Sequence, residues 1–148
     1  MRILVDGDAC PVKAELILLA KKYHLEILIY IDVNHFLEDD YAKIIYCDQG
    51  SDSVDLMLLN KSKVNDLIIT QDYGLACLGI SKKLSVFNFF GEEFNNNNID
   101  SLLFSRYVNA RDRKNGRYTT IKPRTIKDNE NFYLKLDCFI KNILEDKE

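Results

Sequence analysis

The chain begins MRILVDGDACPVKAEL (residues 1–16), and this stretch decides the fold that the sequence predicts. The apolar run Ile3–Val5 is typical of a buried strand and leads directly into Asp6 and Asp8, before Pro11 at the start of an expected helix. Carboxylates at the point where a parallel strand ends and a helix begins lie where open α/β sheets bind their ligands. The stretch therefore predicts an α/β sheet with an acidic site at its carboxyl edge.

The rest of the chain repeats this alternation of short apolar runs and helical periodicity, which favours a mainly parallel sheet covered on both faces. We expect strands at residues 2–5, 25–31, 43–47, 66–70 and 84–89, and helices at residues 11–23, 52–62, 73–80, 99–108 and 129–145. Residues 109–127 are expected to be irregular and basic, and Asp128 to cap the last helix. The 148 residues suit a single domain, a three-layer α/β/α sandwich.

Charge is distributed unevenly along the chain, although the net charge is only −3. The segment from Arg106 to Lys127 holds eight basic residues and one acidic residue, so it carries +7 and the rest carries −10. An acidic body with one basic strip suits a protein that binds a polyanion beside a cation-loaded carboxylate site, and a solvated basic loop is the simpler alternative. The residues expected to contact the polyanion are Arg106, Arg111, Arg113, Lys114, Arg117, Lys122 and Arg124.

Composition argues against several other classes of protein. No apolar run approaches the roughly 20 residues of a membrane span, and the N-terminus lacks the features of a signal peptide. Four scattered cysteines and two isolated histidines lack the spacing of a zinc site. We therefore expect a cytoplasmic protein with reduced thiols and no membrane association. Cys10 could be a nucleophile at a helix start, but a small packed residue is the favoured interpretation.

Three carboxylates are the main candidates for chemistry. Asp6 follows the first strand, Asp72 follows the strand at residues 66–70, and Asp55 is the one polar residue in the run VDLMLL (54–59). Carboxylates that converge on one edge of a sheet repel one another unless a cation lies between them, and hard oxygen ligands without His or Cys favour Mg²⁺ or Mn²⁺. The sequence predicts a divalent metal site of this kind, which suits hydrolysis of phosphodiesters.

Further polar residues flank the predicted metal site. Asp8 and Asp52 are additional candidate ligands, although each lies near a helix start, where an Asp commonly caps the helix. The same alternative applies to Asp72. Thr70 and Gln71, which precede Asp72, are expected to orient a water or a phosphate oxygen of the substrate.

Six segments, in order along nearly the whole chain, resemble the uncharacterised YaiI/YqxD family of bacterial proteins. They are VDGDACP (5–11), GSDSVD (50–55), ITQDYGLA (69–76), Gly91, NIDSLL (98–103) and RDRKNGR (111–117). The family looks like a compact relative of the PIN-domain nucleases, whose α/β/α sandwich uses acidic residues to hold Mg²⁺ or Mn²⁺ and cut RNA. The resemblance implies a PIN-like domain with Asp6, Asp55 and Asp72 as catalytic metal ligands, Asp8 and Asp52 as outer ligands, and single-stranded RNA as substrate.

Three functions remain open at this point. The first is a metal-dependent ribonuclease. The second is a non-catalytic RNA-binding or regulatory protein that keeps the fold, in which the acidic residues form a structural site or ion pairs. The third is a phosphatase of the haloacid-dehalogenase type, with Asp6 as nucleophile and Asp8 as general acid, although Cys10 stands where a Thr or Val is usual there.

Overall fold

A computed structural model describes residues 1–34, 36–48, 51–116 and 122–146, with residues 51–53 described by their backbone alone. One sheet has the strand order β3-β2-β1-β4-β5-β6. The strands are β1 (Arg2–Asp6), β2 (Glu26–Asp32), β3 (Lys43–Cys47), β4 (Leu67–Ile69), β5 (Ser85–Phe87) and β6 (Glu93–Phe94). The first five pair in parallel, and β6 pairs antiparallel with β5. The predicted mainly parallel sheet is confirmed.

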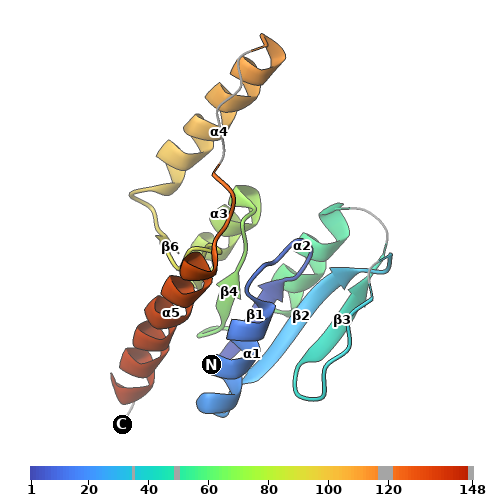
Figure 1. Cartoon of the computed structure of the whole chain (residues 1–148), viewed down its shortest axis with the longest axis vertical. Helices are drawn as coiled ribbons and strands as arrows, with labels where there is room; N and C mark the ends of the chain where they lie inside the picture. Colours follow the sequence, from blue (N-terminus) through green and yellow to red (C-terminus); the bar gives the residue numbers. More distant parts are fainter. Residues whose placement is uncertain (35, 49–50, 117–121, 147–148) are drawn as a thin grey trace.

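Helices cover both faces of the sheet, so the fold is the predicted α/β/α sandwich (Figure 1). The helices are α1 (Lys13–Lys22), α2 (Ser51–Lys61), α3 (Tyr73–Ser81), α4 (Ile99–Lys114) and α5 (Ile126–Asp146). Successive strand residues point to opposite faces. Ile3 and Val5 pack in one core with residues of α1 and α5, whereas Leu4 packs in the other core with residues of α2 and α3. No helix within the described ranges is both long enough and apolar enough to cross a membrane.

Three helices begin at residues other than those predicted, and for α2 the difference is a single residue. Pro11 lies in a turn ahead of α1, which begins at Lys13. At the start of α5 the Thr125 N–H donates to Asp128 Oδ2 over 2.9 Å, and the Asp128 N–H donates to Thr125 Oγ1 over 3.2 Å. This reciprocal pair is a capping box, in which Thr125 is the cap and Asp128 is the third residue of the helix. The prediction that Asp128 is the cap residue is therefore wrong by three positions.

The largest difference from the predicted elements concerns α4. It continues to Lys114, so residues 109–114 are helical and the prediction of an irregular segment from residue 109 is wrong. Ile99 is the buried residue of this helix, and Leu102 and Leu103 are partly buried against the same core, so the helix beyond them contributes nothing to it. Arg and Lys have high helix propensity, and this sustains the helix without packing. Figure 1 shows α4 projecting beyond the sheet. Residues 117–121 of the predicted segment lie outside the described residues.

Gly7 allows the chain to pass close over β2 as it leaves β1. A Cβ at this position would lie 2.6 Å from Ile29 Cγ2 and 2.7 Å from Ile31 Cγ2. The Gly7 N–H donates to the Tyr30 carbonyl over 2.8 Å, which continues the pairing of β1 with β2 by one residue. Only a residue without a side chain fits this passage, and the passage fixes where the following loop begins.

Candidate functional site

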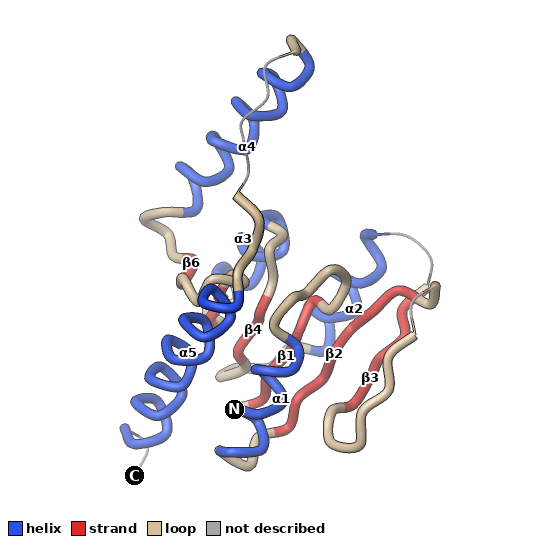
Figure 2. The backbone as a smooth tube through the Cα atoms, viewed as in Figure 1, coloured by secondary structure: helices blue, strands red, loops and turns tan. Residues whose placement is uncertain are grey.

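The predicted acidic site lies between β1 and β4, where the order in which the chain adds strands to the sheet reverses. The chain builds outward from β1 to β2 and β3, and then returns to place β4 on the other side of β1. In doubly wound sheets, ligands bind outside the carboxyl ends of the strands at this switch point. Asp6 ends β1, and Thr70 and Asp72 follow β4, so both neighbours at the switch point carry polar residues. Figure 2 shows these loops on the side of the sheet from which α4 projects.

Thr70 links the two carboxylates at the switch point. Its hydroxyl donates to Asp6 Oδ2 over 2.8 Å and accepts the N–H of Asp72 over 3.0 Å, and the residue is fully buried. Asp72 in turn caps α3, because its Oδ1 accepts the N–H of Leu75 over 3.0 Å. Because Asp6 accepts the one proton of the hydroxyl, Thr70 has none left to donate to a water or a phosphate. It therefore positions the two aspartates, a role that the sequence analysis missed. Its spacing two residues before Asp72 is the signal that could have indicated it.

The pKa of Asp6 is raised to about 6, first by burial and then by repulsion from Asp72 and Asp8, against the opposing hydrogen bond from Thr70. Two of the other predicted carboxylates, Asp72 and Asp8, thus lie close enough to Asp6 to disfavour its charged form. A cation beside Asp6 would favour that charged form.

The loop that follows Asp6 is held by side chains and strained at one residue. Asp8 Oδ1 accepts the N–H of Asp32 over 3.2 Å, so it fastens the loop to the end of β2, and α1 has no side-chain cap. Lys13 Nζ donates to the carbonyls of Gly7 and Cys10 over 2.9 and 3.0 Å. Ala9 has a φ of 58°, a left-handed conformation that costs a residue with a Cβ roughly 1–2 kcal/mol.

Cys10 is a packed residue, as the favoured interpretation of the sequence had it. It is 5% exposed and belongs to the core beneath α1. Burial raises the pKa of its thiol to about 11, which keeps it protonated at neutral pH. The thiolate is the nucleophilic form of cysteine, so this environment is the opposite of the one that activates a catalytic cysteine.

The structure places Asp55 on the second turn of α2. This helix packs Val54 and Leu58 into the core that also contains Leu4, and Asp6 lies two residues beyond Leu4 on the same face of the sheet. Asp55 is partly exposed, and Leu56 beside it is 58% exposed, so α2 is not buried on all sides although the run 54–59 is apolar except for Asp55. The side chain of Asp52, in the first turn, lies outside the described part of the chain.

The donor chemistry at the switch point fits a magnesium or manganese ion. Among the described side chains, no three His, Cys, Asp or Glu residues are gathered closely enough to hold a metal by themselves. Mg²⁺ does not require such a cage, because it keeps several waters and is commonly bound through one or two carboxylates together with phosphates of the substrate. Asp6 and Asp72 supply oxygen donors of this kind, and their repulsion is relieved by a cation.

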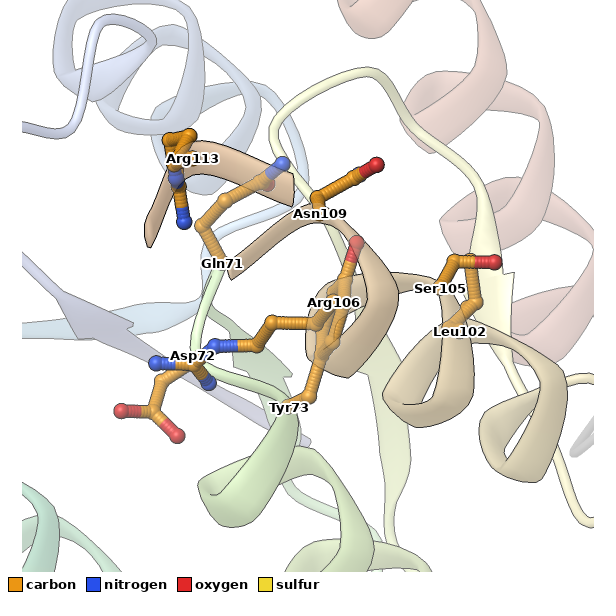
Figure 3. Close-up of a pocket in the computed structure, with 8 residues that line it drawn as sticks. All are labelled: Gln71, Asp72, Tyr73, Leu102, Ser105, Arg106, Asn109 and Arg113. Carbon is orange, nitrogen blue, oxygen red and sulfur yellow. The ribbon is translucent and has the colours of Figure 1, made fainter. Parts of the chain in front are cut away.

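A cleft of about 620 Å³ opens beside Asp72, between the start of α3 and the helix α4 (Figure 3). Its lining residues are Gln71, Asp72, Tyr73, Leu102, Ser105, Arg106, Asn109 and Arg113. The Arg106 side chain extends from α4 in the direction of Asp72 (Figure 3). Gln71, which was predicted to orient substrate, uses its Oε1 to accept the N–H of Phe89 over 3.0 Å. The cleft thus has Asp72 at the start of α3 on one side and the cationic residues Arg106 and Arg113 of α4 on the other.

The basic strip divides into separate groups along α4. Arg106 and Arg113 line the cleft, whereas Arg111 and Lys114 are exposed and do not line it. Arg111 lies two residues from both Asn109 and Arg113, and residues at that spacing do not share a helix face. Only part of the charge that the sequence analysis assigned to substrate is therefore turned toward the acidic residues.

The last predicted basic residues belong to the connection before α5. Arg124 donates through Nε to Asn129 Oδ1 over 2.6 Å and through Nη2 to the Phe89 carbonyl, and it stacks 4.7 Å above the Phe90 ring. These contacts fasten the connection to the loop between β5 and β6, so Arg124 has a structural role that the sequence did not indicate. Lys122 is exposed, and Arg117 lies outside the described residues.

Fold and site together define a doubly wound α/β protein with a carboxylate group at its switch point and a cationic helix beside it. The model of the family described as "Uncharacterized BCR, YaiI/YqxD family" matches residues 4–142, and the chain belongs to this family. The resemblance seen in the sequence is confirmed.

The relatives are of similar length to this chain and are named UPF0178 proteins. One from Natranaerobius thermophilus is 43% identical over 133 residues, which cover 89% of this chain and 90% of the relative. One from Lachnoclostridium phytofermentans is 39% identical over 147 residues, which cover 97% and 99%. One from Clostridium tetani is 43% identical over 124 residues, which cover 84% of each. No solved structure matches the chain.

Proposed function

We propose that the protein is a divalent-metal-dependent ribonuclease that hydrolyses phosphodiesters of single-stranded RNA. The observation that carries the proposal is the placement of Asp6 and Asp72 at the switch point, where both bond to the Thr70 hydroxyl, beside a cleft whose other wall presents Arg106. An anionic substrate needs positive charge at the reacting phosphate, and the two walls would supply it in complementary ways: carboxylates that hold a cation and a guanidinium that contacts the phosphate directly.

Each residue of the site would have a distinct task. Asp6, Asp55 and Asp72 would hold Mg²⁺ or Mn²⁺, and Asp8 and Asp52 are candidates for outer positions. When bound, such an ion neutralises charge on the scissile phosphate and lowers the pKa of water.

Proton binding to Asp6 would limit the reaction at low pH. Thr70 keeps Asp6 oriented through its hydrogen bond, and Asp6 must be ionised to act as a ligand. Since its pKa is raised to about 6, activity is expected to fall as the pH drops below that value. The resemblance of the sequence to a family that looks like a relative of the PIN-domain nucleases also favours the proposal.

The test is cleavage of a labelled single-stranded RNA by purified protein with Mn²⁺, compared with the Asp6→Asn and Asp72→Ser variants. Serine caps a helix about as well as aspartate, so Asp72→Ser removes the carboxylate while keeping the start of α3 intact. We expect both variants to lose cleavage, and the exposed Asp40→Asn variant to keep it. Cleavage that persists in both site variants would overturn the proposal.

A second candidate, non-catalytic RNA binding, has one observation in its favour. Arg106 and Arg113 make no hydrogen bond or ion pair with the described residues, so the cationic wall is available whatever the carboxylates do. On this alternative, RNA binding persists in EDTA, weakens steeply with salt, and is never followed by cleavage under any metal. The phosphatase alternative predicts instead a transient phosphoryl group on Asp6.

A further inference from the structure

We propose that one face of α4, and not the basic strip as a whole, binds the strand, with Arg106 and Arg113 holding two separate phosphates. The inner face of α4 is defined here as Leu102, Ser105, Arg106, Asn109 and Arg113. The inference rests on the proposed function for the identity of the polyanion. The inference specifies which side of α4 contacts the nucleic acid, how many of its charges bind phosphates, and whether the ligand is a single strand or a duplex.

The inner face is a continuous stripe along the helix. Its members recur every three or four residues, which places them on one side, and all five line the cleft opposite Gln71 and Asp72 (Figure 3). Arg106 and Arg113 are separated by seven residues, which corresponds to about 10.5 Å along the helix axis. The two guanidinium groups therefore reach different phosphates, and Ser105 and Asn109 offer polar groups between them.

The charges on this face are available for a ligand. Neither Arg106 nor Arg113 is bonded to a described carboxylate, in contrast to Arg2, which pairs with Asp66 over 2.6 Å. A guanidinium binds a phosphate through two parallel hydrogen bonds, and such charge-assisted pairs are the strong ones. The strand would thus extend from the acidic pair at the switch point outward along α4.

The dimensions of the cleft favour a single strand. The cleft of about 620 Å³ is of the size that receives a small organic molecule, and Asp72 is its acidic lining residue. Unpaired nucleotides can be splayed into a cleft of this size, whereas the stacked and paired bases of a duplex cannot enter it. The ligand class is single-stranded nucleic acid with at least two phosphates beyond the one at the carboxylates.

The opposite side of the same helix supplies a matched control. The outer face of α4 is defined as Phe104, Tyr107, Arg111 and Lys114, all of them exposed. Arg111 and Lys114 carry the same total charge as Arg106 and Arg113 and lie on the same helix. A purely diffuse attraction between a basic segment and RNA would therefore be weakened equally by neutralising either pair.

The experiment measures binding of a fluorescent 12-nucleotide single-stranded RNA in EDTA, over a range of salt concentrations, to the wild type and two double variants. For R106Q/R113Q we expect affinity to fall by about tenfold or more and the slope of log K against log salt to become shallower by about 1.4, which is the value for two phosphate contacts on a single strand. For R111Q/K114Q we expect less than a twofold change. Circular dichroism checks that both variants keep their helix content.

The outcomes separate this inference from the proposed nuclease activity, because binding in EDTA needs no turnover. Equal weakening by the two double variants would overturn the inference, as would equal affinity for a duplex of the same length or failure of the wild type to bind. Selective loss in R106Q/R113Q, together with no cleavage under Mn²⁺ or Mg²⁺, would support the inference and remove the nuclease proposal.

Discussion

The Thr70 hydroxyl donates to Asp6 Oδ2 over 2.8 Å across the junction of β1 and β4. The register of the two strands produces this contact, because Val5 pairs with Ile69 and the next residue on each strand is polar. The bond joins a carboxylate from the first strand to a hydroxyl that also accepts the N–H of Asp72. One buried side chain therefore sets the relative positions of two candidate metal ligands that are 66 residues apart in the chain.

Thr70→Val tests this linkage with a side chain of similar shape and no hydroxyl. The variant removes the donor to Asp6 and the acceptor for the Asp72 N–H, so we expect the free energy of unfolding to fall by about 1–3 kcal/mol. The pKa of Asp6 should rise further, because the hydrogen bond that opposes its shift is lost. Urea unfolding at pH 7 and titration of Asp6 by NMR measure the two effects. Thr70→Ser keeps the hydroxyl, so the pKa of Asp6 should stay close to its wild-type value in that variant.

Asp6 should make the metal-free protein less stable as the pH rises. Its pKa in the folded state, about 6, lies above its ordinary value of 3.8, so between these values the folded state binds more protons than the unfolded state. Stability from this group is therefore complete below about pH 4 and lost as the pH rises through 6. We expect Asp6→Asn to match the wild type at pH 4 and to exceed it by about 2 kcal/mol at pH 7.5.

Urea unfolding in EDTA at several pH values measures this difference. Comparison of the two proteins at each pH cancels the contribution of the other titrating groups. A difference between wild type and Asp6→Asn that does not change with pH would contradict the raised pKa of Asp6.

A divalent cation should reverse the destabilisation by Asp6. At pH 7.5, millimolar Mg²⁺ or Mn²⁺ is expected to raise the Tm of the wild type by about 3 °C, a shift that corresponds to about 1 kcal/mol in a protein of this size. At pH 5 the shift should largely vanish, because Asp6 is then mostly protonated. Calorimetry gives the Tm values. An equal shift in Asp6→Asn at pH 7.5 would place the cation elsewhere on the protein.

Gly7→Ala should disturb the loop that leads from β1 to Asp8. The added Cβ would meet Ile29 Cγ2 at 2.6 Å and Ile31 Cγ2 at 2.7 Å, and overpacking of this kind costs about 1–3 kcal/mol. Gly116→Ala is the control, since a Cβ there meets nothing within 4 Å and costs only the strain of a φ of 80°, about 1 kcal/mol. Denaturant unfolding compares the two variants, and a smaller loss for Gly7→Ala would contradict the close passage.

The sequence predicted the fold well in the strands, where burial determines which residues are apolar. The strand at residues 43–47 was predicted with its observed bounds, and the other parallel strands were found within a few residues, because each is a short apolar run between turns. Asp6 and Asp72 could be found because parallel strands bring their carboxyl ends to one edge. β6 was missed, since an edge strand of two residues leaves too little alternation to detect.

Where a side chain points could not be predicted from composition alone. The run 54–59 is apolar except for Asp55, yet Leu56 is exposed, because α2 packs only one side against the sheet. The basic strip was treated as one unit, but the continuation of α4 turns Arg113 toward the cleft and Arg111 away from it. Arg124 contacts the loop before β6, which is distant in sequence, so no local pattern indicates its role.

The shallow anchoring of α4 makes its two ends differ in how they exchange amide protons with solvent. Ile99 is its one buried residue, so the amides of its distal half are protected by the helix's own hydrogen bonds alone. Brief fraying exposes them, whereas the amides of β1 exchange only when the whole domain opens. We therefore expect the amides around the candidate ligand-binding arginines to exchange faster than those of the strand that ends at the candidate metal ligand Asp6.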